Sequence, residues 1–265
     1  MTSSSLMLRS WPASALAVWA AAREAGRCSA DDVLHTLHDY AQVHELDPGG
    51  DILDLLGAVS GANAMCVRLP APGDAQGLPP GRPTDAAMAA GEVILIDDRE
   101  PEGPSTPAAG AMRALALVPI STAERCRWQS MRYDRDVAVG ALLSDSPLGE
   151  VEYELRSAVA EAATSIAALG GRRGSPADLR DALAARVSAS TIDLPPHDNP
   201  RVDRVLASAA QIDAIVSLTG TGELGDSGSQ LATADERLRG LSALARRARS
   251  AAVNTLIADY RFRAG

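Results

Sequence analysis

The 265-residue chain contains no lysine, so all 25 of its basic side chains are arginine. This absence excludes every mechanism that depends on a lysine amine. Schiff-base catalysis, covalent attachment of pyridoxal phosphate and the phosphate-binding lysine of a P-loop are examples. Lysine-dependent nuclease and kinase sites are excluded for the same reason.

Aromatic residues and cysteines are also scarce. The chain has eight aromatic residues, among them a single phenylalanine, Phe262, so alanine and leucine must fill most of the core. Small side chains allow helices to approach closely, which favours helix-on-helix packing. The three cysteines are widely spaced and form no CxxC motif, which argues against a disulfide framework or a zinc site and suits a reducing cytoplasm.

Long apolar runs are missing, and no segment has the length of a transmembrane helix, so we expect no membrane association. Residues 11–22 are small and apolar and follow Arg9, which leaves two interpretations. One is a weak signal peptide within residues 1–22. The other, which we favour, is a helix capped by Ser10 with Pro12 in its first turn.

The net charge of −9 is unevenly distributed. Residues 237–265 carry seven arginines and one carboxylate, for a net charge of +6, so the rest of the chain has a net charge of −15. The body of the protein therefore repels nucleic acid, and only the last helix has the charge to attract an anionic partner.

Helical periodicity dominates the first 60 residues. We predict helices over 11–25, 30–46 and 52–59, the second opened by a capping box of Ser29 and Asp32. The next segment is different: residues 64–69, 92–96, 115–120, 125–133 and 137–143 resemble strands. Because no long crossover helix separates the last of these, we expect a small, mostly antiparallel sheet of three to five strands.

From residue 146 onward the apolar spacing is helical throughout. Helices are expected from 146, from Pro176, from Pro200 and over 231–261, and short connections would make them antiparallel neighbours. The predicted fold class is therefore α+β and mostly helical. An α/β module (1–145) with N-terminal helices and a small antiparallel sheet is followed by a three- or four-helix bundle (146–265).

Two motifs in the loop after residue 219 do not fit their surroundings. Residues 220–225 match GxGxxG, but a dinucleotide site needs flanking strands, and the preceding segment is helical. Residues 225–229 resemble the nucleophile sequence of trypsin-like serine proteases, whose two β-barrels and upstream catalytic histidine motif are missing here. We expect neither activity, and no bound cofactor.

The metal-site candidates are weak. His35 and His38 lie about 60° apart on one predicted helix and can share a metal, whereas His44 falls on the apolar side beside Leu37. Asp97 and Asp98 follow the best predicted strand, where carboxylates are common magnesium ligands. These sets are also typical of solvated surface.

Two further side chains are possible reactive groups. His197 lies in a Pro-Pro-His-Asp loop with no partner visible in the sequence. Cys28 precedes a predicted helix, whose dipole would lower the pKa of its thiol.

The last helix carries the most distinctive pattern. Leucines and alanines follow one face, and four arginines lie on or near the opposite face: Arg239, Arg246, Arg247 and Arg249. Arginines near a helix C-terminus are favoured by the helix dipole, and they can also contact an acidic protein or, less favourably, nucleic acid. In a further alternative the arginine stripe faces the acidic N-terminal half of the chain.

Several phrases of the chain resemble those of uncharacterised proteins from high-GC actinobacteria. They are Pro72-Gly73-Asp74 with Leu78-Pro79-Pro80, Ala90-Gly91-Glu92, and Leu194-Pro195-Pro196 ahead of Arg204-Val205-Leu206. The resemblance implies a group of organisms and no activity. A GC-rich genome also accounts for the exclusive use of arginine.

These observations favour a non-enzymatic cytoplasmic protein that acts through protein–protein contact, with an acidic partner or a second copy as the candidates. The alternatives are a metal-assisted hydrolase using Asp97, Asp98 and His197, and an anion or nucleic-acid binder using the arginines of the last helix.

Overall fold

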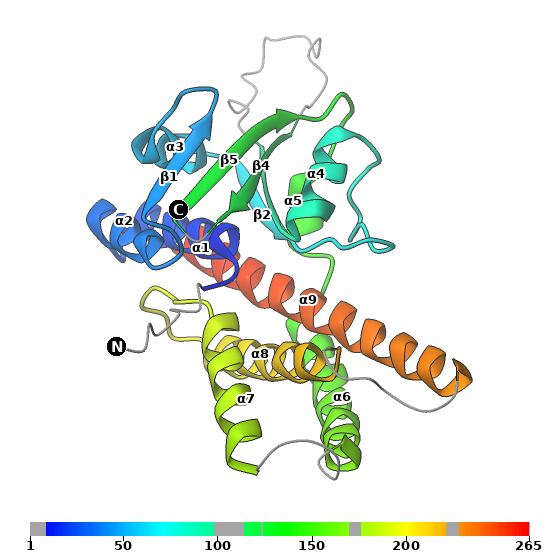
Figure 1. The fold of residues 1–265 in the computed structure, drawn as a ribbon. Helices are drawn as coiled ribbons and strands as arrows, with labels where there is room; N and C mark the ends of the chain where they lie inside the picture. Colours follow the sequence, from blue (N-terminus) through cyan, green and yellow to red (C-terminus); the bar gives the residue numbers. More distant parts are fainter. Residues whose placement is uncertain (1–8, 98–113, 123, 170–175, 221–227, 265) are drawn as a thin grey trace.

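The computed structural model describes residues 9–97, 114–122, 124–169, 176–220 and 228–264. The N-terminal half contains α1 (Pro12–Glu24), α2 (Ala30–His38), β1 (Val43–Asp47), α3 (Ile52–Val59), β2 (Ala64–Arg68), α4 (Arg82–Ala90), β3 (Val93–Asp97), β4 (Leu115–Ser121), β5 (Arg125–Arg132) and α5 (Val139–Leu143). The C-terminal half contains α6 (Leu148–Leu169), α7 (Pro176–Ser190), α8 (Pro200–Gly220) and α9 (Gly228–Ala264). The predicted α+β class, with a small sheet followed by a helical bundle, is confirmed (Figure 1).

The five strands form one sheet in the order β1-β5-β4-β3-β2. Three of the four strand pairs are antiparallel, and β1 pairs with β5 in parallel, so the sheet is mixed rather than wholly antiparallel. Parallel pairing is possible because the chain between β1 and β5 is long enough to cross the sheet.

The predicted helix over 30–46 is wrong in its second half. Helix α2 ends at His38, and residues 43–47 form β1. The capping box of Ser29 and Asp32 is confirmed, with both reciprocal hydrogen bonds present. The error arose because residues 43–47 gain a strand partner, β5, that is about 80 residues away in sequence, and such tertiary pairing overrides local helical period.

The predicted strand over 137–143 is also wrong, because Val139–Leu143 forms the short helix α5. It packs against β2 and β3 on the same sheet face that α4 covers at β4. The apolar residues that suggested a strand are therefore explained by burial of one helix face, and Val139 is buried.

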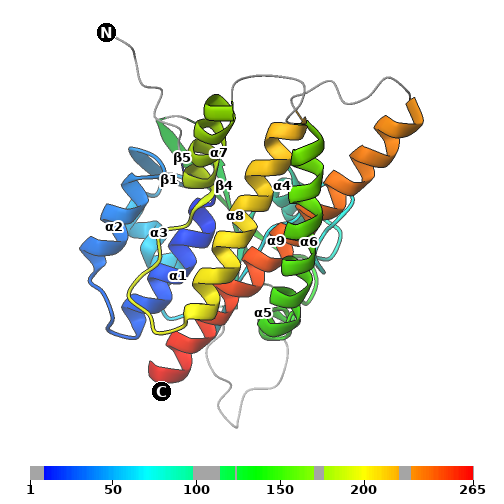
Figure 2. The ribbon, with the colours of Figure 1, turned by 90° about the horizontal axis from the view of Figure 1, so that it is seen from below.

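Helix α1 lies on the opposite face of the sheet and is almost completely buried. Ten of its thirteen residues are buried, and they contact β2, β3, β4 and α9. The segment that raised the possibility of a signal peptide is thus part of the folded core (Figure 2).

One hydrophobic core runs through both halves of the chain. It joins residues of α1, the sheet and α3 to residues of α6, α8 and α9, including Leu16, Trp128, Leu155, Val205 and Leu256. Helix α9, about 55 Å long at 1.5 Å per residue, crosses beneath the sheet and also packs on α6 and α8 (Figures 1 and 2). A smaller second core fills the space between the sheet and α4 and α5.

Helix α9 also closes one edge of the sheet. The backbone N–H of Val67 in β2 donates to Asn254 Oδ1 at 2.8 Å, and the Val67 carbonyl accepts from Asn254 Nδ2 at 3.1 Å and Ser250 Oγ at 2.8 Å. At the other edge, Leu46 of β1 exchanges both backbone hydrogen bonds with Gly50. These contacts occupy backbone groups that an edge strand otherwise offers to a foreign strand.

Candidate functional site

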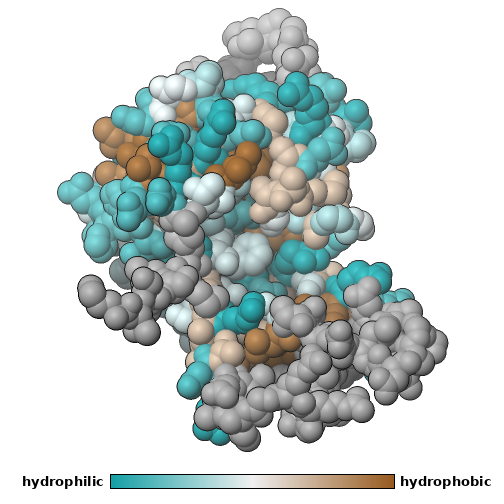
Figure 3. Space-filling view, in the orientation of Figure 1, coloured by the Kyte–Doolittle hydropathy of each residue, from teal (hydrophilic) through white to brown (hydrophobic). Residues whose placement is uncertain are grey.

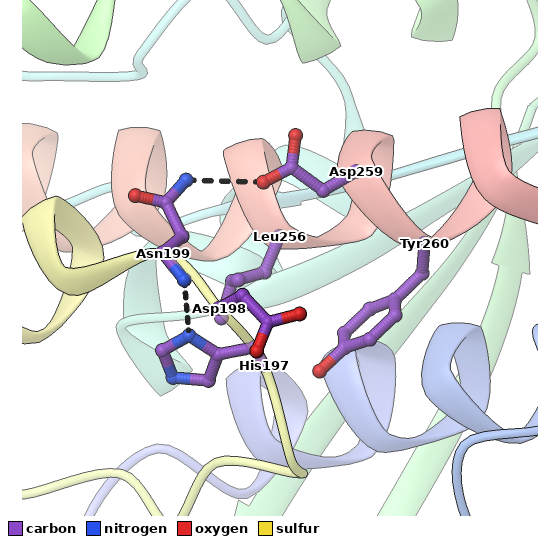
Figure 4. Close-up of a pocket in the computed structure, with 6 residues that line it drawn as sticks. All are labelled: His197, Asp198, Asn199, Leu256, Asp259 and Tyr260. Atoms are coloured by element: carbon purple, nitrogen blue, oxygen red, sulfur yellow. Dashed lines mark hydrogen bonds between the residues drawn. The ribbon is translucent and has the colours of Figure 1, made fainter.

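A shallow pocket lies between the loop before α8 and the C-terminal part of α9. Its empty volume is about 230 Å³, including open solvent, and it is lined by His197, Asp198, Asn199, Leu256, Asp259 and Tyr260 (Figure 4). It brings together a histidine, two carboxylates and a phenol, so its residue types make it a candidate catalytic site.

The hydrogen bonds of this pocket show that its polar groups already have structural partners. His197 Nδ1 accepts from the Asn199 backbone N–H at 3.2 Å, and Nε2 lies 3.3 Å from Asp203 Oδ1. Asn199 Nδ2 donates to Asp259 Oδ2 at 3.0 Å, and the Tyr260 hydroxyl donates to the Pro196 carbonyl at 3.0 Å. These bonds fasten the loop before α8 onto α9.

A second polar cluster is buried where α1, β3, α8 and α9 meet. Glu92, which is 3% exposed and immediately precedes β3, accepts from the backbone N–H groups of Ala13 and Ser14 at 3.0 and 3.1 Å. Its carboxylate also accepts from Ser14 Oγ at 3.2 Å. Glu92 therefore caps the N-terminus of α1 from a distant part of the sequence, and the predicted cap by Ser10 is wrong: the Ser10 N–H instead donates to the Ala189 carbonyl.

Arg249 of α9 completes this cluster. Its guanidinium is buried, lies 2.7 Å from Asp213 Oδ2 of α8 and stacks 4.3 Å from the ring centre of Trp11. Trp11 has a φ of +76°, a left-handed conformation that costs a non-glycine residue about 1 kcal/mol or more. Stacking against a desolvated guanidinium offsets part of this cost.

Burial sets the protonation of Glu92. It raises the pKa of the carboxyl to about 7, and the three hydrogen bonds from α1 and the positive charge of Arg249 oppose this rise. A strongly shifted pKa in a polar cluster often marks a functional site. Here Glu92 bonds α1 and Arg249 pairs with α8, and the stacking of Arg249 on Trp11 links these two contacts across the two halves, so each polar group has a structural role.

A third buried pair lies on the inner face of β1 and β5. Trp128 Nε1 donates to His44 Nδ1 at 3.1 Å, so the proton of the neutral ring sits on Nε2, which donates to the Leu37 carbonyl at 2.9 Å. Burial lowers the pKa of His44. The prediction that His44 lies on the buried side beside Leu37 is confirmed, although on a strand rather than a helix.

The described metal-site candidates lie on separate elements. His35 and His38 are exposed on α2, and Asp97 is at the end of β3, where its carbonyl accepts from the Asn63 N–H. Asp98 lies outside the described residues, as do 221–227 of the GxGxxG and protease-like motifs. Within the described part of the chain, no three His, Cys, Asp or Glu side chains are placed to hold a metal ion.

Cys28 does not have the activated thiol that its position suggested. Its Sγ lies 3.7 Å from the Trp19 carbonyl, and burial, assisted by Asp32, raises the pKa of the thiol. Burial also raises the pKa of Cys66 and Cys126 to about 12. The thiolate, the reactive form, is thus disfavoured at each position.

The four arginines of the last helix have different environments. Arg239 and Arg247 are exposed, Arg246 is half-buried and Arg249 is buried. Arg247 forms an ion pair with Glu154 of α6, and Arg249 pairs with Asp213. Arg249 therefore lies on the interior side of α9, whereas the other three keep exposed or partly exposed side chains.

Comparison with known proteins gives a family for the whole chain. The N-terminal domain model of the Rv1486c-like proteins matches residues 13–141, and the C-terminal domain model matches residues 149–250. The chain belongs to the Rv1486c-like family.

Relatives support this assignment over nearly the full length. Uncharacterized protein Rv1486c of Mycobacterium tuberculosis (strain H37Rv) is 30% identical, covering 93% of this chain and 97% of the relative. Uncharacterized protein ML1804 of Mycobacterium leprae is 29% identical with the same coverage. The resemblance to an uncharacterised actinobacterial family is confirmed. No solved structure matches the chain.

This member of the Rv1486c-like family exposes two of its eight aromatic side chains. Tyr153 of α6 is 70% exposed, and Phe262 near the end of α9 is 90% exposed. Tyr153 was not among the predicted site residues, although the helical spacing around it indicates its position. Val151, Leu155 and Ala158 define the buried side of α6, and residue 153 falls opposite them at 100° per residue.

Smaller hydrophobic side chains are exposed on the sheet half. Leu53 of α3 is 61% exposed, and Val43 and Ile120 on the sheet are 44% and 45% exposed. Figure 3 shows separate hydrophobic areas over α3 and over the β5–β4 part of the sheet within a mainly hydrophilic surface. Within the described residues, no helix is both long enough and apolar enough to cross a membrane.

Proposed function

We propose that this Rv1486c-like protein is a non-enzymatic cytoplasmic protein that binds an acidic protein partner through its C-terminal half. The observation that carries the proposal is the exposure of Tyr153 beside Glu154, the residue that contacts Arg247 of α9. Tyrosine and arginine are both residue types that protein interfaces concentrate at their energetic centres.

The charge of this surface supports an acidic partner. Arg239, Arg246 and Arg247 lie on α9 within about two turns, and the exposed pair of Arg247 with Glu154 is solvent-screened and contributes little to folding. An arginine in such a pair can exchange its carboxylate for one from a partner, because guanidinium groups bind carboxylates in two-pronged geometry. The division at residue 145 into two modules forms part of this proposal, with the second module as the binding half.

The test compares variants of the full chain in an actinobacterial lysate by affinity capture and mass spectrometry. Arg239→Glu/Arg247→Glu and Tyr153→Ala should each lose the same captured protein, whereas Arg135→Glu, an exposed arginine paired with Asp134, should retain it. Capture that is identical for all four proteins would overturn the proposal. Loss of capture after nuclease treatment would favour the nucleic-acid alternative instead.

A further inference from the structure

Among the described residues, part of the sheet is exposed on the face that α4 and α5 occupy elsewhere. Helix α4 packs on β4 and α5 packs on β2 and β3, whereas β1, β5 and the end of β4 carry exposed side chains on this face. We call this region the open sheet face and define it by Val43, Glu45, Asp47, Ile120, Arg125 and Arg127. These residues share one face because side chains alternate along each strand, and the intervening His44, Cys126 and Trp128 are buried on the other face.

The open sheet face carries a column of acidic residues beside a column of basic residues. Glu45 and Asp47 lie on β1, and Arg125 and Arg127 lie on β5. Arg125 Nη1 is 2.8 Å from Glu45 Oε1, and Arg127 Nε is 2.8 Å from Asp47 Oδ2. Both arginine side chains remain more than half exposed, at 58% and 59%, so their other donors are available to a partner.

This arrangement is complementary to itself in one orientation. Consider a two-fold axis that runs parallel to β1 and β5, in front of the open sheet face and midway between the two strands. Rotation about this axis places the basic column of one copy over the acidic column of the other. Because Glu45 and Arg127 are register partners across β1 and β5, each Arg127 then faces Glu45 of the second copy. A two-fold axis across the strands would instead oppose acid to acid and base to base.

We propose that the open sheet face binds the same face of a second copy of this chain about that strand-parallel two-fold axis. The two exposed hydrophobic residues of the face lie beside the charged pairs: Ile120 is on β4 at the level of Arg127, and Val43 is on β1 at the level of Arg125. The backbone groups of Val67 on β2 and Leu46 on β1 are already bonded within the chain, which disfavours association by adding strand to strand.

The experiment uses two full-length variants with opposite uniform charge on this face. Glu45→Arg/Asp47→Arg makes the face wholly basic, and Arg125→Glu/Arg127→Glu makes it wholly acidic. At low salt the parent chain should dimerise in sedimentation velocity, each variant alone should be monomeric, and their equimolar mixture should form a mixed dimer in native mass spectrometry. Added salt should dissociate the parent dimer and the mixed dimer alike.

Two measurements guard against misfolded variants. Circular dichroism and melting curves establish that each variant folds. Arg135→Glu is the matched control and should dimerise like the parent. The proposal is overturned if the parent chain stays monomeric at its highest soluble concentration. It is also overturned if the wholly basic or the wholly acidic variant still dimerises alone, or if their mixture forms no mixed dimer.

Discussion

Asn254 of α9 bonds the backbone of Val67 in β2 at both its N–H and its carbonyl, as a neighbouring strand would do. The asparagine is 2% exposed and separated from Val67 by 187 positions in sequence. A helix side chain thus completes the sheet, and the first prediction concerns this contact.

Asn254→Ala should lower the free energy of unfolding by about 1–3 kcal/mol, because it leaves the buried Val67 N–H without its acceptor. Urea unfolding monitored by circular dichroism measures the change. Thr255→Ala is the control on the same helix: its hydroxyl bonds only the Ala251 carbonyl one turn earlier, and we expect a change below about 0.5 kcal/mol. Equal effects at the two positions would contradict the role given to Asn254.

The buried carboxyl of Glu92 should make stability depend on pH in an unusual direction. Its folded-state pKa is about 7, above the ordinary value of 4.5, so the folded chain binds a proton more tightly than the unfolded chain between these values. Its contribution to stability is therefore present below about pH 4.5 and is lost as pH rises through about 7. The expected size is of order 3 kcal/mol.

Glu92→Gln removes this titration. Between pH 5 and pH 8 the parent should lose unfolding free energy and the variant should not, so the variant should become more stable relative to the parent as pH rises. Urea unfolding at a series of pH values gives the difference directly. Parallel pH profiles for the two proteins would show that Glu92 does not titrate in this range.

His44 should act in the opposite sense. Burial lowers its folded-state pKa, so stability from the neutral ring is present above the ordinary pKa of about 6.5 and is lost as pH falls through the folded value. His44→Gln should flatten the acid side of the stability profile. An acid side that is the same for the parent and for His44→Gln would contradict this role of His44.

Removing one partner of the Arg249–Asp213 ion pair should destabilise the protein more than replacing both partners with apolar side chains. Arg249→Met leaves the Asp213 carboxylate, which is 19% exposed, without its cation and should cost about 3 kcal/mol. The double variant Arg249→Met/Asp213→Leu should be more stable than Arg249→Met alone. Additive losses in this double-mutant cycle would mean that the two side chains do not interact.

Residues 146–265 expressed alone should not unfold cooperatively. In the full chain Ala248, Ala252, Val253, Leu256 and Ile257 of α9 are buried in the core shared by the two halves. Thermal circular dichroism should show a broad transition for the fragment and a sharp one for the full chain. Adding residues 1–145 to the fragment should restore a sharp transition. A sharp transition for the fragment alone would contradict the shared core.

Local patterns were sufficient to predict most of the helices and strands. Residues 52–59 formed the predicted helix, and the β-branched run that ends at Ile96 formed the predicted buried strand, because propensity, capping and burial all agree there. Prediction failed for residues 43–47, whose strand partner lies elsewhere in the chain, and for 137–143, where an apolar run was too short to show its period.

The polar cluster around Glu92 could not be predicted from sequence. Nothing in the neighbourhood of Glu92 indicates that it caps α1, which begins 80 positions earlier, and Arg249 looked like a member of an exposed basic stripe. Both roles depend on where α1, α8 and α9 meet. The solvent-facing position of Tyr153, in contrast, follows from the helical spacing of α6 alone, although Tyr153 was not among the predicted site residues.

The closing of the β2 edge by α9 has a consequence for how the protein is made. All five strands have been synthesised once residue 132 is added, but Ser250 and Asn254 are added more than 110 residues later. Throughout that interval the nascent sheet presents an unpaired strand edge that a chaperone or a neighbouring nascent chain can occupy. A chain truncated before residue 250 therefore keeps the β2 edge unpaired, and cellular quality control can recognise the truncated chain by this edge.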